Sequence, residues 1–535
     1  MDYLEPDHIM KADLYPITEG ALFTDQYQLT MSQLYFKLGI HEKMAQFDHF
    51  FREYPDYGLH KAGYCINAGL EWLLDWMTQY RFTPREINFL REQKNPSGKP
   101  LYDAGFLKWL KNEANFNHLT LYAIPEGRVI HPHEPLTVVH GPLLMAQLLE
   151  TALLNKLNYQ ILIATRASRI RQIGKGQLLL EFGARRGHDK GAIAGARAAL
   201  IGGADYTSNV GISHALGLPP KGTHSHSMVQ IFLALGMSEL DAFRAFAELY
   251  PENCVLLVDT INTLESGLPH AIRVFEEMRA RGHKPLGIRL DSGDLAYLSI
   301  QAAKMLDKAG FNDVHIVLSN ELDELNIWQI ITEISKEAPQ VGVDPDQLIS
   351  RLIYGVGTRL ITSAGYSALG GVYKLTALKN GEQWQPVLKI SESLSKIPNP
   401  GNKRVYRLYD YQDKALADYI CLDTENPQKA EKIHLHHPID VSKHRSLQGD
   451  RLSRMESLLL TILDRGKLIY DLPDIKAIRQ HREKDMESLD FGVKRLVNPH
   501  IYHVSISKEL WELKMNLIDQ VKSNSKNDRS VSHEG

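Results

Sequence analysis

The middle of the chain alternates short apolar runs with segments whose apolar residues recur every three or four positions. "CVLLVDT" (254–260) is an apolar run rich in valine that ends in an aspartate, and "LGIRLDSGD" (286–294) is a second run of the same kind. Between the two runs, the apolar positions share one helical face: Leu268, Ala271, Ile272, Phe275 and Met278. A proline near the start of this segment and a glycine just past its end fit the boundaries of a helix. The pattern predicts a strand, a helix and a second strand.

The same alternation continues on both sides of these elements. Another helical pattern follows residue 294 and closes at Gly310, and three more apolar runs end in polar residues: "QLLLEFGARR" (177–186), "VHIVLSN" (314–320) and "LIYGVGT" (352–358). Successive strand ends lie roughly 30 residues apart, which is about one βα unit each. Fully apolar strands that alternate with amphipathic helices predict a parallel sheet covered by helices.

The polar clusters all come directly after the predicted strands. In a βα barrel these positions line one mouth, where active sites form, whereas an open doubly wound sheet gathers some of them at its switch point. The number of clusters favours the barrel. The regular alternation is missing before about residue 140 and after about residue 380. We therefore predict an α/β fold in which 141–380 form a βα barrel, 1–140 and 381–521 form a second α+β domain, and 522–535 form a disordered tail.

Composition narrows the class of protein. The 535 residues are 43% hydrophobic and carry 61 Lys and Arg against 64 Asp and Glu, a net charge of −3. This balance argues against nucleic acid or an anionic membrane as a partner. The three cysteines lack metal-ligand spacing, and neither a signal pattern nor a run of about 18 apolar residues is present. We expect a cytoplasmic enzyme or binding protein without a membrane span.

Two arginines follow the strand in "EFGARRGHD" (181–189). The guanidinium fork of Arg185 or Arg186 matches a carboxylate or a phosphate, although two such arginines are as readily explained as solvated or salt-bridged surface. Phe182 could stack on a planar ring or belong to the core. Each residue alone leaves both interpretations open.

The segment "RLDSGDL" (289–295) places Arg289, Asp291 and Asp294 around a Ser-Gly turn. These carboxylates could hold Mg²⁺, bind a ribose hydroxyl or cap the next helix. Capping suits Asp294 by its position, and Asp291, at the strand end, is the better functional candidate.

Two glycine-bearing segments, "YGVGT" (354–358) and "ALGGVYKL" (368–375), lie about a dozen residues apart. Glycines let backbone N–H groups approach a phosphate closely, and Thr358 adds a hydroxyl. Either segment could also be a tight turn. Their proximity after a strand favours a phosphate site.

Two histidines lie in "KGTHSHSMVQ" (221–230). In an extended backbone His224 and His226 point to the same side. No third ligand lies nearby, which argues against zinc, and a histidine can act as a nucleophile toward a phosphoryl group or be purely structural. "VLLVDTINT" (255–263) superficially resembles the phosphoribosyl-pyrophosphate loop of type I phosphoribosyltransferases, but it has a single acid and lacks the glycine, so we interpret the likeness as a decoy.

Taken together, these motifs resemble the nicotinate phosphoribosyltransferase family of type II phosphoribosyltransferases. The matches occur in the family's order: "TDQYQLTM" (24–31), "FDHFFREYP" (47–55), "EFGARR", "YTSNV" (206–210), "GTHSHS", "VDTINTLESG", "IRLDSGDL", "YGVGT", "LGGVYKL" and "PGNKRVYR". Each motif is weak alone, whereas the ordered set is specific.

The resemblance implies an irregular α/β barrel beside a domain built from both chain ends. It also implies an ATP-coupled enzyme that makes nicotinate mononucleotide and pyrophosphate from nicotinate and 5-phosphoribosyl 1-pyrophosphate in the salvage route to NAD. The implied cofactor is Mg²⁺, with ligands that the resemblance does not assign, and ATP is a co-substrate. The implied assembly is a homodimer whose subunits share active sites.

Residue roles follow from the resemblance for the pyridine base. Phe182 and Tyr27 would sandwich the ring, with Tyr27 coming from the partner subunit, and Arg185 with Thr223 would pair with the carboxylate. Where the nicotinamide-specific relative carries an acidic residue, this chain has Ser208, whose hydroxyl can donate to a carboxylate. The resemblance thus favours nicotinate over nicotinamide.

The remaining roles concern phosphate and sugar. The resemblance places the phosphorylated histidine at His226 and assigns no role to His224. Arg289 and Asp291 would handle the phosphoribosyl group. The 5-phosphate would be held by Gly357, Thr358, Gly370 and Gly371.

Three alternatives remain. Nicotinamide phosphoribosyltransferase would use the same chemistry with the uncharged base. Quinolinate phosphoribosyltransferase is disfavoured because it is much shorter and needs a basic cluster for two carboxylates. A catalytically inactive barrel that binds a ligand would predict damaged motifs, whereas His226, Arg185, Asp291 and Thr358 are all present.

Overall fold

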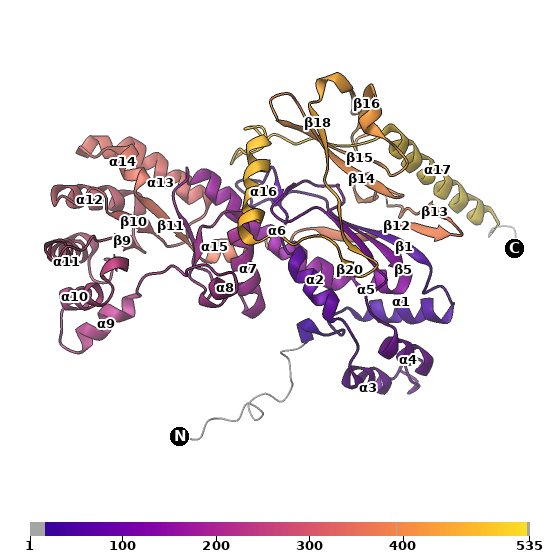
Figure 1. Cartoon of the computed structure of the whole chain (residues 1–535), viewed down its shortest axis with the longest axis horizontal. Helices are drawn as coiled ribbons and strands as arrows, with labels where there is room; N and C mark the ends of the chain where they lie inside the picture. The colour runs from indigo at the N-terminus through magenta and orange to yellow at the C-terminus, as the bar shows by residue number, and fades with distance from the viewer. Residues whose placement is uncertain (1–16, 392, 532–535) are drawn as a thin grey trace.

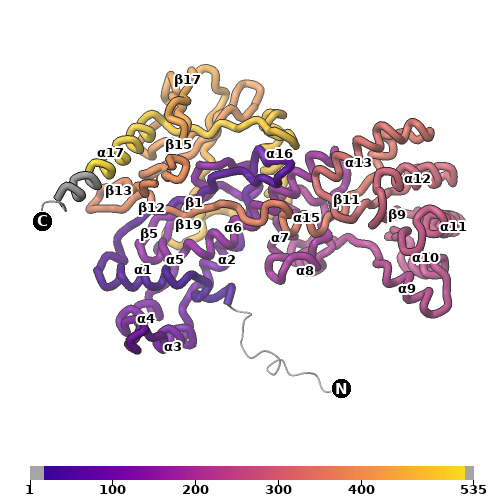
Figure 2. The backbone as a smooth tube through the Cα atoms, turned by 180° about the vertical axis from the view of Figure 1, so that it is seen from behind, coloured from indigo at the N-terminus to yellow at the C-terminus, as the bar shows by residue number. Residues whose placement is uncertain are grey.

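The computed structural model describes residues 17–391 and 393–531, and it places two differently built parts side by side (Figures 1 and 2). One part holds the parallel sheet and its helices, and the other holds the antiparallel sheets and both ends of the described chain. A single cluster of buried apolar side chains runs through both parts. Among the described residues, no helix is long and apolar enough to cross a membrane.

The first part contains a six-stranded parallel sheet in the order β7-β6-β11-β10-β9-β8. Its strands are β6 (Leu179–Glu181), β7 (Tyr206–Thr207), β8 (Val255–Leu257), β9 (Gly287–Leu290), β10 (His315–Leu318) and β11 (Leu352–Val356). Its helices are α7 (Asp189–Gly202), α8 (Val210–Ala215), α9 (His226–Ala234), α10 (Glu239–Leu249), α11 (Leu268–Ala280), α12 (Leu295–Lys308), α13 (Glu324–Glu337), α14 (Pro345–Ser350) and α15 (Thr358–Ile361).

Every apolar run predicted to be a strand in this part is one, and the two helical patterns became α11 and α12. Pro269 stands in the first turn of α11, and Gly282 and Gly310, just past α11 and α12, have φ values of 83° and 77° that suit glycine. The sheet curls into an irregular barrel that stays open: within the described chain, no ladder joins β7 to β8.

The second part is built from both chain ends. Its seven-stranded sheet has the order β13-β12-β1-β5-β3-β19-β20, with β1 (Met44–Phe51), β3 (Thr120–Ala123), β5 (Thr137–Pro142), β12 (Gly371–Asn380), β13 (Gln383–Pro386), β19 (Leu460–Asp464) and β20 (Lys467–Leu468). A six-stranded sheet, β17-β16-β21-β15-β14-β18, consists of β14 (Lys403–Tyr409), β15 (Ala415–Leu422), β16 (Lys432–His436), β17 (His444–Gln448), β18 (Arg454–Ser457) and β21 (Val504–Ile506). A small pair joins β2 (Cys65–Ile66) to β4 (Val129–Ile130). The predicted fold class is confirmed.

Helices link and cover these sheets. They are α1 (Gln26–Lys37), α2 (Leu70–Gln79), α3 (Pro84–Glu92), α4 (Ala104–Asn112), α5 (Leu143–Leu148), α6 (Glu150–Ile173), α16 (Ile475–Ser488) and α17 (Lys508–Val531). Helices α6, α7 and α16 lie between the two parts in both views (Figures 1 and 2). The long α6 is buried along most of its second half and packs on α7, α13 and β12.

Two segments differ from the sequence expectation. β12 falls inside the range 141–380 but pairs antiparallel with β1, because its mixed apolar and polar side chains suit a half-buried strand rather than a fully buried parallel one. The helix α17 starts on a buried face and continues to Val531, so it extends into the range 522–535 for which we expected disorder. Residues 532–535 of that range lie outside the described residues.

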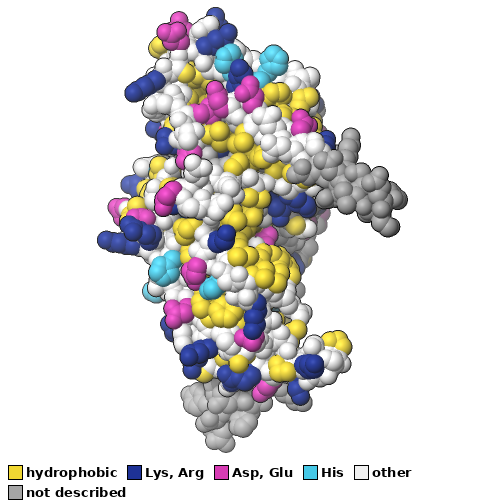
Figure 3. Space-filling model, turned by 90° about the vertical axis from the view of Figure 1, so that its right-hand side faces the viewer, with side chains coloured by type: hydrophobic (Ala, Val, Ile, Leu, Met, Phe, Trp, Pro, Cys, Tyr) yellow, Lys and Arg dark blue, Asp and Glu magenta, His cyan; other side chains and the backbone are white. Residues whose placement is uncertain are grey.

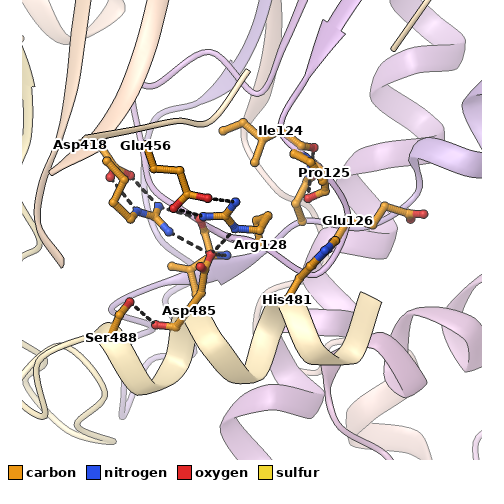
Figure 4. Close-up of polar contacts among 12 residues, drawn as sticks. Ile124, Pro125, Glu126, Arg128, Asp418, Glu456, His481, Asp485 and Ser488 are labelled. Atoms are coloured by element: carbon orange, nitrogen blue, oxygen red, sulfur yellow. Dashed lines mark hydrogen bonds and ion pairs between the residues drawn. The ribbon is translucent and has the colours of Figure 1, made fainter. Parts of the chain in front are cut away.

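Charged side chains, most of them buried, tie strands of the second part to α16, the helix that lies between the two parts. Arg128, in the turn before β4, pairs with Asp485 of α16 and with Glu456 of β18 (Figure 4). Arg407 of β14 pairs with Asp418 of β15 and with the same Asp485. We refer to these five residues as the junction cluster. It links the amino-terminal third of the chain to its last hundred residues.

Candidate active site

Polar side chains gather where β8, β9 and β10 end, beside the loop that leads into α9. Parallel strands bring their carboxyl ends to one edge of a sheet, so side chains far apart in the sequence meet there. Figure 1 shows β9, β10 and β11 side by side, with α9 near the same end of the molecule. We call His226, Asp259, Arg289, Asp291 and Ser319 the rim cluster.

Arg289 is the centre of one half of the rim cluster. Its Nε donates to Ser319 Oγ (2.9 Å), its Nη1 to Thr223 Oγ1 (3.0 Å) and its Nη2 to Asp291 Oδ1 (3.0 Å). Ser319 Oγ also donates to Asp291 Oδ1. Because three groups from three loops hold one guanidinium, its plane is fixed before any ligand arrives.

His226 and Asp259 form the other half. His226 is the first residue of α9, and its Nε2 lies 3.0 Å from Asp259 Oδ1. The second oxygen, Oδ2, accepts from the backbone N–H of Asp291 (3.1 Å) and from Ser292 Oγ (2.5 Å). The carboxylate of Asp259 therefore joins both halves. An ionised carboxylate only accepts, so Nε2 of His226 donates the proton and Nδ1 keeps a lone pair in the neutral ring.

The two histidines differ in their surroundings. The His226 side chain is 38% exposed, whereas His224 is buried and its Nε2 accepts from the backbone N–H of Leu257 (3.0 Å). Burial lowers the pKa of His224 to about 4, so its ring is neutral at physiological pH. Of the two histidines, His226 is therefore the one accessible to a ligand.

Phe182 lies at the end of β6, beside Arg289. Its backbone N–H donates to Val356 O (2.8 Å), and the guanidinium carbon of Arg289 is 5.6 Å from its ring centroid. A Cβ on Gly355 would come within 2.5 Å of the ring, so only glycine at that position leaves room for Phe182. The ring packs with a small apolar cluster in the curl of the sheet.

The side chain of Glu181 fixes the turn that follows Phe182. Its buried carboxyl group accepts from Gly183 N–H and from Thr207 Oγ1, and burial raises its pKa. The N–H of Ser208 donates to Glu181 O (2.9 Å), so Ser208 lies beside this strand end. Arg185 is exposed in the turn.

The two glycine segments flank one turn of α6. Tyr159 of α6 donates from its hydroxyl to Ile361 O (2.7 Å), at the end of the short helix that follows Gly357 and begins at Thr358. The neighbouring Asn158 contacts Gly371, where a Cβ would lie 2.3 Å from Asn158 Oδ1. Gly370 has open space around it. Both segments are thus anchored to the same helix.

Tyr27 is a predicted site residue that a single chain does not bring to the rim cluster. It lies on α1, beside the seven-stranded sheet and away from β9 and β10 (Figures 1 and 2). Its hydroxyl donates to Glu150 Oε2 (3.2 Å), and burial together with Glu150 raises its pKa. Tyr27 as a whole is 47% exposed.

Sequence reasoning missed Asp259, Ser319 and Gly355. Asp259 was set aside as part of a decoy motif, although its position directly after a strand was the same signal that singled out Asp291. Ser319 ends "VHIVLSN" in the same way. Asp294, in contrast, caps α12 by accepting from Tyr297 N–H, as its position predicted.

No group of three or more described His, Cys, Asp or Glu residues is arranged to hold a metal ion. The three cysteines are buried and free. On the face drawn in Figure 3, positive and negative side chains are interspersed, and neither sign dominates.

Comparison with known proteins defines the class. In the solved structures, human nicotinic acid phosphoribosyltransferase matches with a TM-score of 0.74 and 28% identity over 92% of this chain and 99% of that one. The nicotinate-nucleotide pyrophosphorylase of Pyrococcus furiosus shares the fold, with a TM-score of 0.63 at 20% identity over 91% of this chain and 99% of that one. The fold is that of pyridine phosphoribosyltransferases.

Sequence comparison narrows the class to one family. The family model described as nicotinate phosphoribosyltransferase matches residues 178–421, and models of its N- and C-terminal domains match 22–158 and 402–514. The nicotinate phosphoribosyltransferase of Bacillus subtilis is 38% identical over 94% of this chain and 96% of its own, and that of Dictyostelium discoideum 32% over 97% and 92%. The chain belongs to the nicotinate phosphoribosyltransferase family.

Proposed function

We propose that this chain transfers the phosphoribosyl group of 5-phosphoribosyl 1-pyrophosphate to nicotinate, and that ATP drives the reaction through a phosphate carried by His226. Family membership supports the transfer, as a step toward NAD. The ATP coupling rests on one observation: the half-exposed His226 is hydrogen-bonded through Nε2 to the nearly fully buried carboxylate of Asp259.

That contact leaves Nδ1 of His226 as the nucleophile. The lone pair on Nδ1 attacks the γ-phosphorus of ATP, the bond from this phosphorus to the bridging oxygen breaks, and ADP leaves with the electron pair. Asp259 stabilises the imidazolium charge that develops. After the transfer, water attacks the phosphorus, the P–N bond breaks, and inorganic phosphate is released.

Sugar transfer needs little covalent help from the protein. Positive charge develops at the sugar carbon as pyrophosphate leaves. Thr223 and Ser319 hold Arg289 and Asp291 rigidly, so that these two side chains can orient the sugar and the departing pyrophosphate. The glycine segments at Gly357 and Gly371, anchored by α6, would receive the 5-phosphate together with Thr358 and Gly370.

The residues present fit a Mg²⁺ ion held mainly by the substrate. Mg²⁺ commonly binds one or two carboxylates plus substrate phosphates, and Asp291 is a partly exposed carboxylate at this rim. When bound, the ion would neutralise charge on the pyrophosphate.

Phe182, Arg185 and Ser208 support nicotinate as the base. Phe182 offers a ring face beside the sheet end, Arg185 is exposed in the next turn, and Ser208 lies next to the same strand. Arg185 would pair with the carboxylate of nicotinate, and no acidic side chain replaces Ser208 to favour the neutral amide. Nicotinamide remains the alternative base.

Tyr27 would complete the site only from a second chain. Its exposed ring lies away from the rim cluster of its own chain, which supports a homodimer with shared active sites. Exposed apolar side chains on α8 and in and after α9 provide a surface for such a contact: Val210, Ile231, Leu233, Leu235 and Met237.

The decisive experiment incubates the protein with γ-labelled ATP and then assays both bases. We expect acid-labile, base-stable label in the wild type, none in His226→Ala, and label retained in the matched His214→Ala. Product from nicotinate supports the proposal, whereas product from nicotinamide alone or label unchanged in His226→Ala contradicts it. Absence of product from either base would favour the inactive ligand-binding barrel.

A further inference from the structure

The parallel sheet has two free edges that face each other across the open side of the barrel. At one edge, β7 presents the backbone carbonyl of Thr207. At the other, β8 presents the backbone N–H of Leu257, while its neighbour Val258 turns its own N–H inward to Arg289 O (3.2 Å). Free strand edges carry unpaired backbone groups that must find partners when shielded from water.

The segment 221–224 supplies both partners. The N–H of Lys221 donates to Thr207 O (3.0 Å), and three residues later Nε2 of His224 accepts from the N–H of Leu257 (3.0 Å). Between them, Thr223 Oγ1 is held by Arg289 Nη1 (3.0 Å). Three extended residues span at most about 10 Å, so this segment crosses the open side in place of a strand.

The contacts to β8 and to the residues just after it follow a regular register. His224 meets Leu257, and two residues further on His226 meets Asp259, so both pairs are separated by 33 positions in the sequence. In a parallel ladder, residues i and i+2 face j and j+2 in this way. Here the ring nitrogen of His224 takes the place of a backbone carbonyl, and the second contact joins two side chains.

His224 is fixed as a neutral acceptor. Because Nε2 receives the Leu257 proton, the ring proton lies on Nδ1, which is 3.3 Å from Ser225 O. Phe246 of α10 packs edge-on against the ring, with 5.0 Å between centroids. Burial holds the pKa of His224 at about 4, so the acceptor persists across the physiological range.

We propose that His224 is a positioning residue that sets the register of the 221–226 segment against β8 and thereby keeps His226 on Asp259. This inference rests on the proposed function only for the role of His226. Without the His224 acceptor, the segment loses its anchor two residues before the reacting histidine. His226 then leaves Asp259 more often, and its phosphorylation slows more than the transfer that proceeds without ATP.

The test compares three variants of the full chain. His224→Phe keeps a ring but removes the acceptor, and His224→Gln can place an amide oxygen near the position of Nε2. Phe246→Leu is the matched control, because it changes the packing on His224 and leaves the hydrogen bond. If His224→Phe does not fold, His224→Asn replaces it, since its side chain is too short to reach Leu257.

Two readouts are measured: hydrogen exchange of the peptide that contains the Leu257 amide, and the rate of label transfer from γ-labelled ATP to His226. For His224→Phe we expect exchange at least about tenfold faster and phosphorylation at least about tenfold slower. The ATP-independent transfer rate should change by less than about twofold, because Arg289 keeps its contacts with Ser319 and Asp291 and still holds Thr223. His224→Gln should recover most of both losses, and Phe246→Leu should show neither.

Unchanged exchange at Leu257 in His224→Phe would overturn the proposal, as would faster exchange with an unaltered phosphorylation rate. Equal losses in Phe246→Leu would also overturn it, because they would reduce His224 to a packing role. A wild-type protein that takes up no label contradicts the proposed ATP coupling instead. The contact of His224 is then judged by Leu257 exchange alone, where protection lost in His224→Phe supports it and unchanged protection refutes it.

Discussion

The junction cluster and the rim cluster both pair arginine with carboxylates, yet they differ in how fully their polar atoms are hydrogen-bonded and shielded from water. Arg407 is fully buried and donates hydrogen bonds to Asp418, Asp485 and the backbone carbonyl of Val129. At the rim, the side chain of His226 is 38% exposed and that of Asp291 24%. A buried charged group whose hydrogen bonds are all made within the protein cannot bind a ligand, whereas a partly exposed one can.

The difference also appears in what each cluster joins. The junction cluster holds strands and a helix from opposite chain ends in one arrangement (Figure 4). The rim cluster holds side chains of successive strand ends in mutual contact. Next to Asp259, Thr260 Oγ1 is buried from solvent and has no hydrogen-bond partner among the described residues. We therefore expect changes at the junction to alter stability and changes at the rim to alter catalysis.

The largest effect should follow Arg407→Met. It leaves Asp418 and Asp485 buried with less compensation, which typically costs about 3–5 kcal/mol. Urea and thermal unfolding measure the loss, and the activity of the remaining folded protein should be close to wild type. Lys284→Met, at an exposed pair with Asp313, is the control and should cost below about 1 kcal/mol. Equal losses in both variants would remove the distinction between buried and exposed pairs.

Asp259→Asn should alter catalysis without a matching loss of stability. The asparagine oxygen satisfies the donors Asp291 N–H and Ser292 Oγ, so its NH₂ group faces His226 and forces the ring proton onto Nδ1. The nucleophilic lone pair is then lost, and phosphorylation of His226 should fall about 100-fold, equivalent to about 3 kcal/mol. Ser292→Ala removes one donor but keeps the carboxylate, and a loss as large as that of Asp259→Asn would contradict this account.

The smallest expected effect is a loss of folding stability at low pH when Glu456 becomes protonated. Burial tends to raise the pKa of Glu456, but hydrogen bonds and charge from Arg128 lower it to about 2. The unfolded pKa lies near 4.3, so this stabilisation is nearly complete above about pH 5 and is lost as the pH falls toward 2. We expect about 1 kcal/mol, because Glu456 is partly exposed.

Unfolding free energies at pH 5 and pH 3 measure this contribution. Glu456→Gln should flatten the dependence, whereas Glu382→Gln, at an exposed side chain, should leave it unchanged. An identical pH dependence in the wild type and Glu456→Gln would show that the junction carboxylate does not contribute in this range.

Much of the parallel part could be predicted because its signals are local. Apolar runs gave the strands, helical periodicity gave α11 and α12, and the position after a strand identified Asp291, with Arg289 in the same motif, as a rim residue. The pairing of β12 with β1 could not be predicted, since it depends on which distant edge is free rather than on the strand's own sequence.

Contacts between residues far apart in the chain also could not be predicted from the sequence. Nothing local to His226 indicates that Asp259 lies 3.0 Å away, because the contact arises only when the segment before α9 crosses the open side of the barrel. The junction cluster likewise unites Arg128, Arg407 and Asp485, which no spacing rule connects.

The pairing of β1 with β12 has a consequence during synthesis. The ribosome finishes β1 more than three hundred residues before β12 exists, and β19, the partner of β3, follows later still. At about 5–20 residues per second, the outer edge of β1 waits roughly 15 to 60 seconds for its neighbour. During that interval the nascent chain carries an unprotected strand edge that chaperones would have to shield, and transcripts truncated before residue 371 should yield insoluble product.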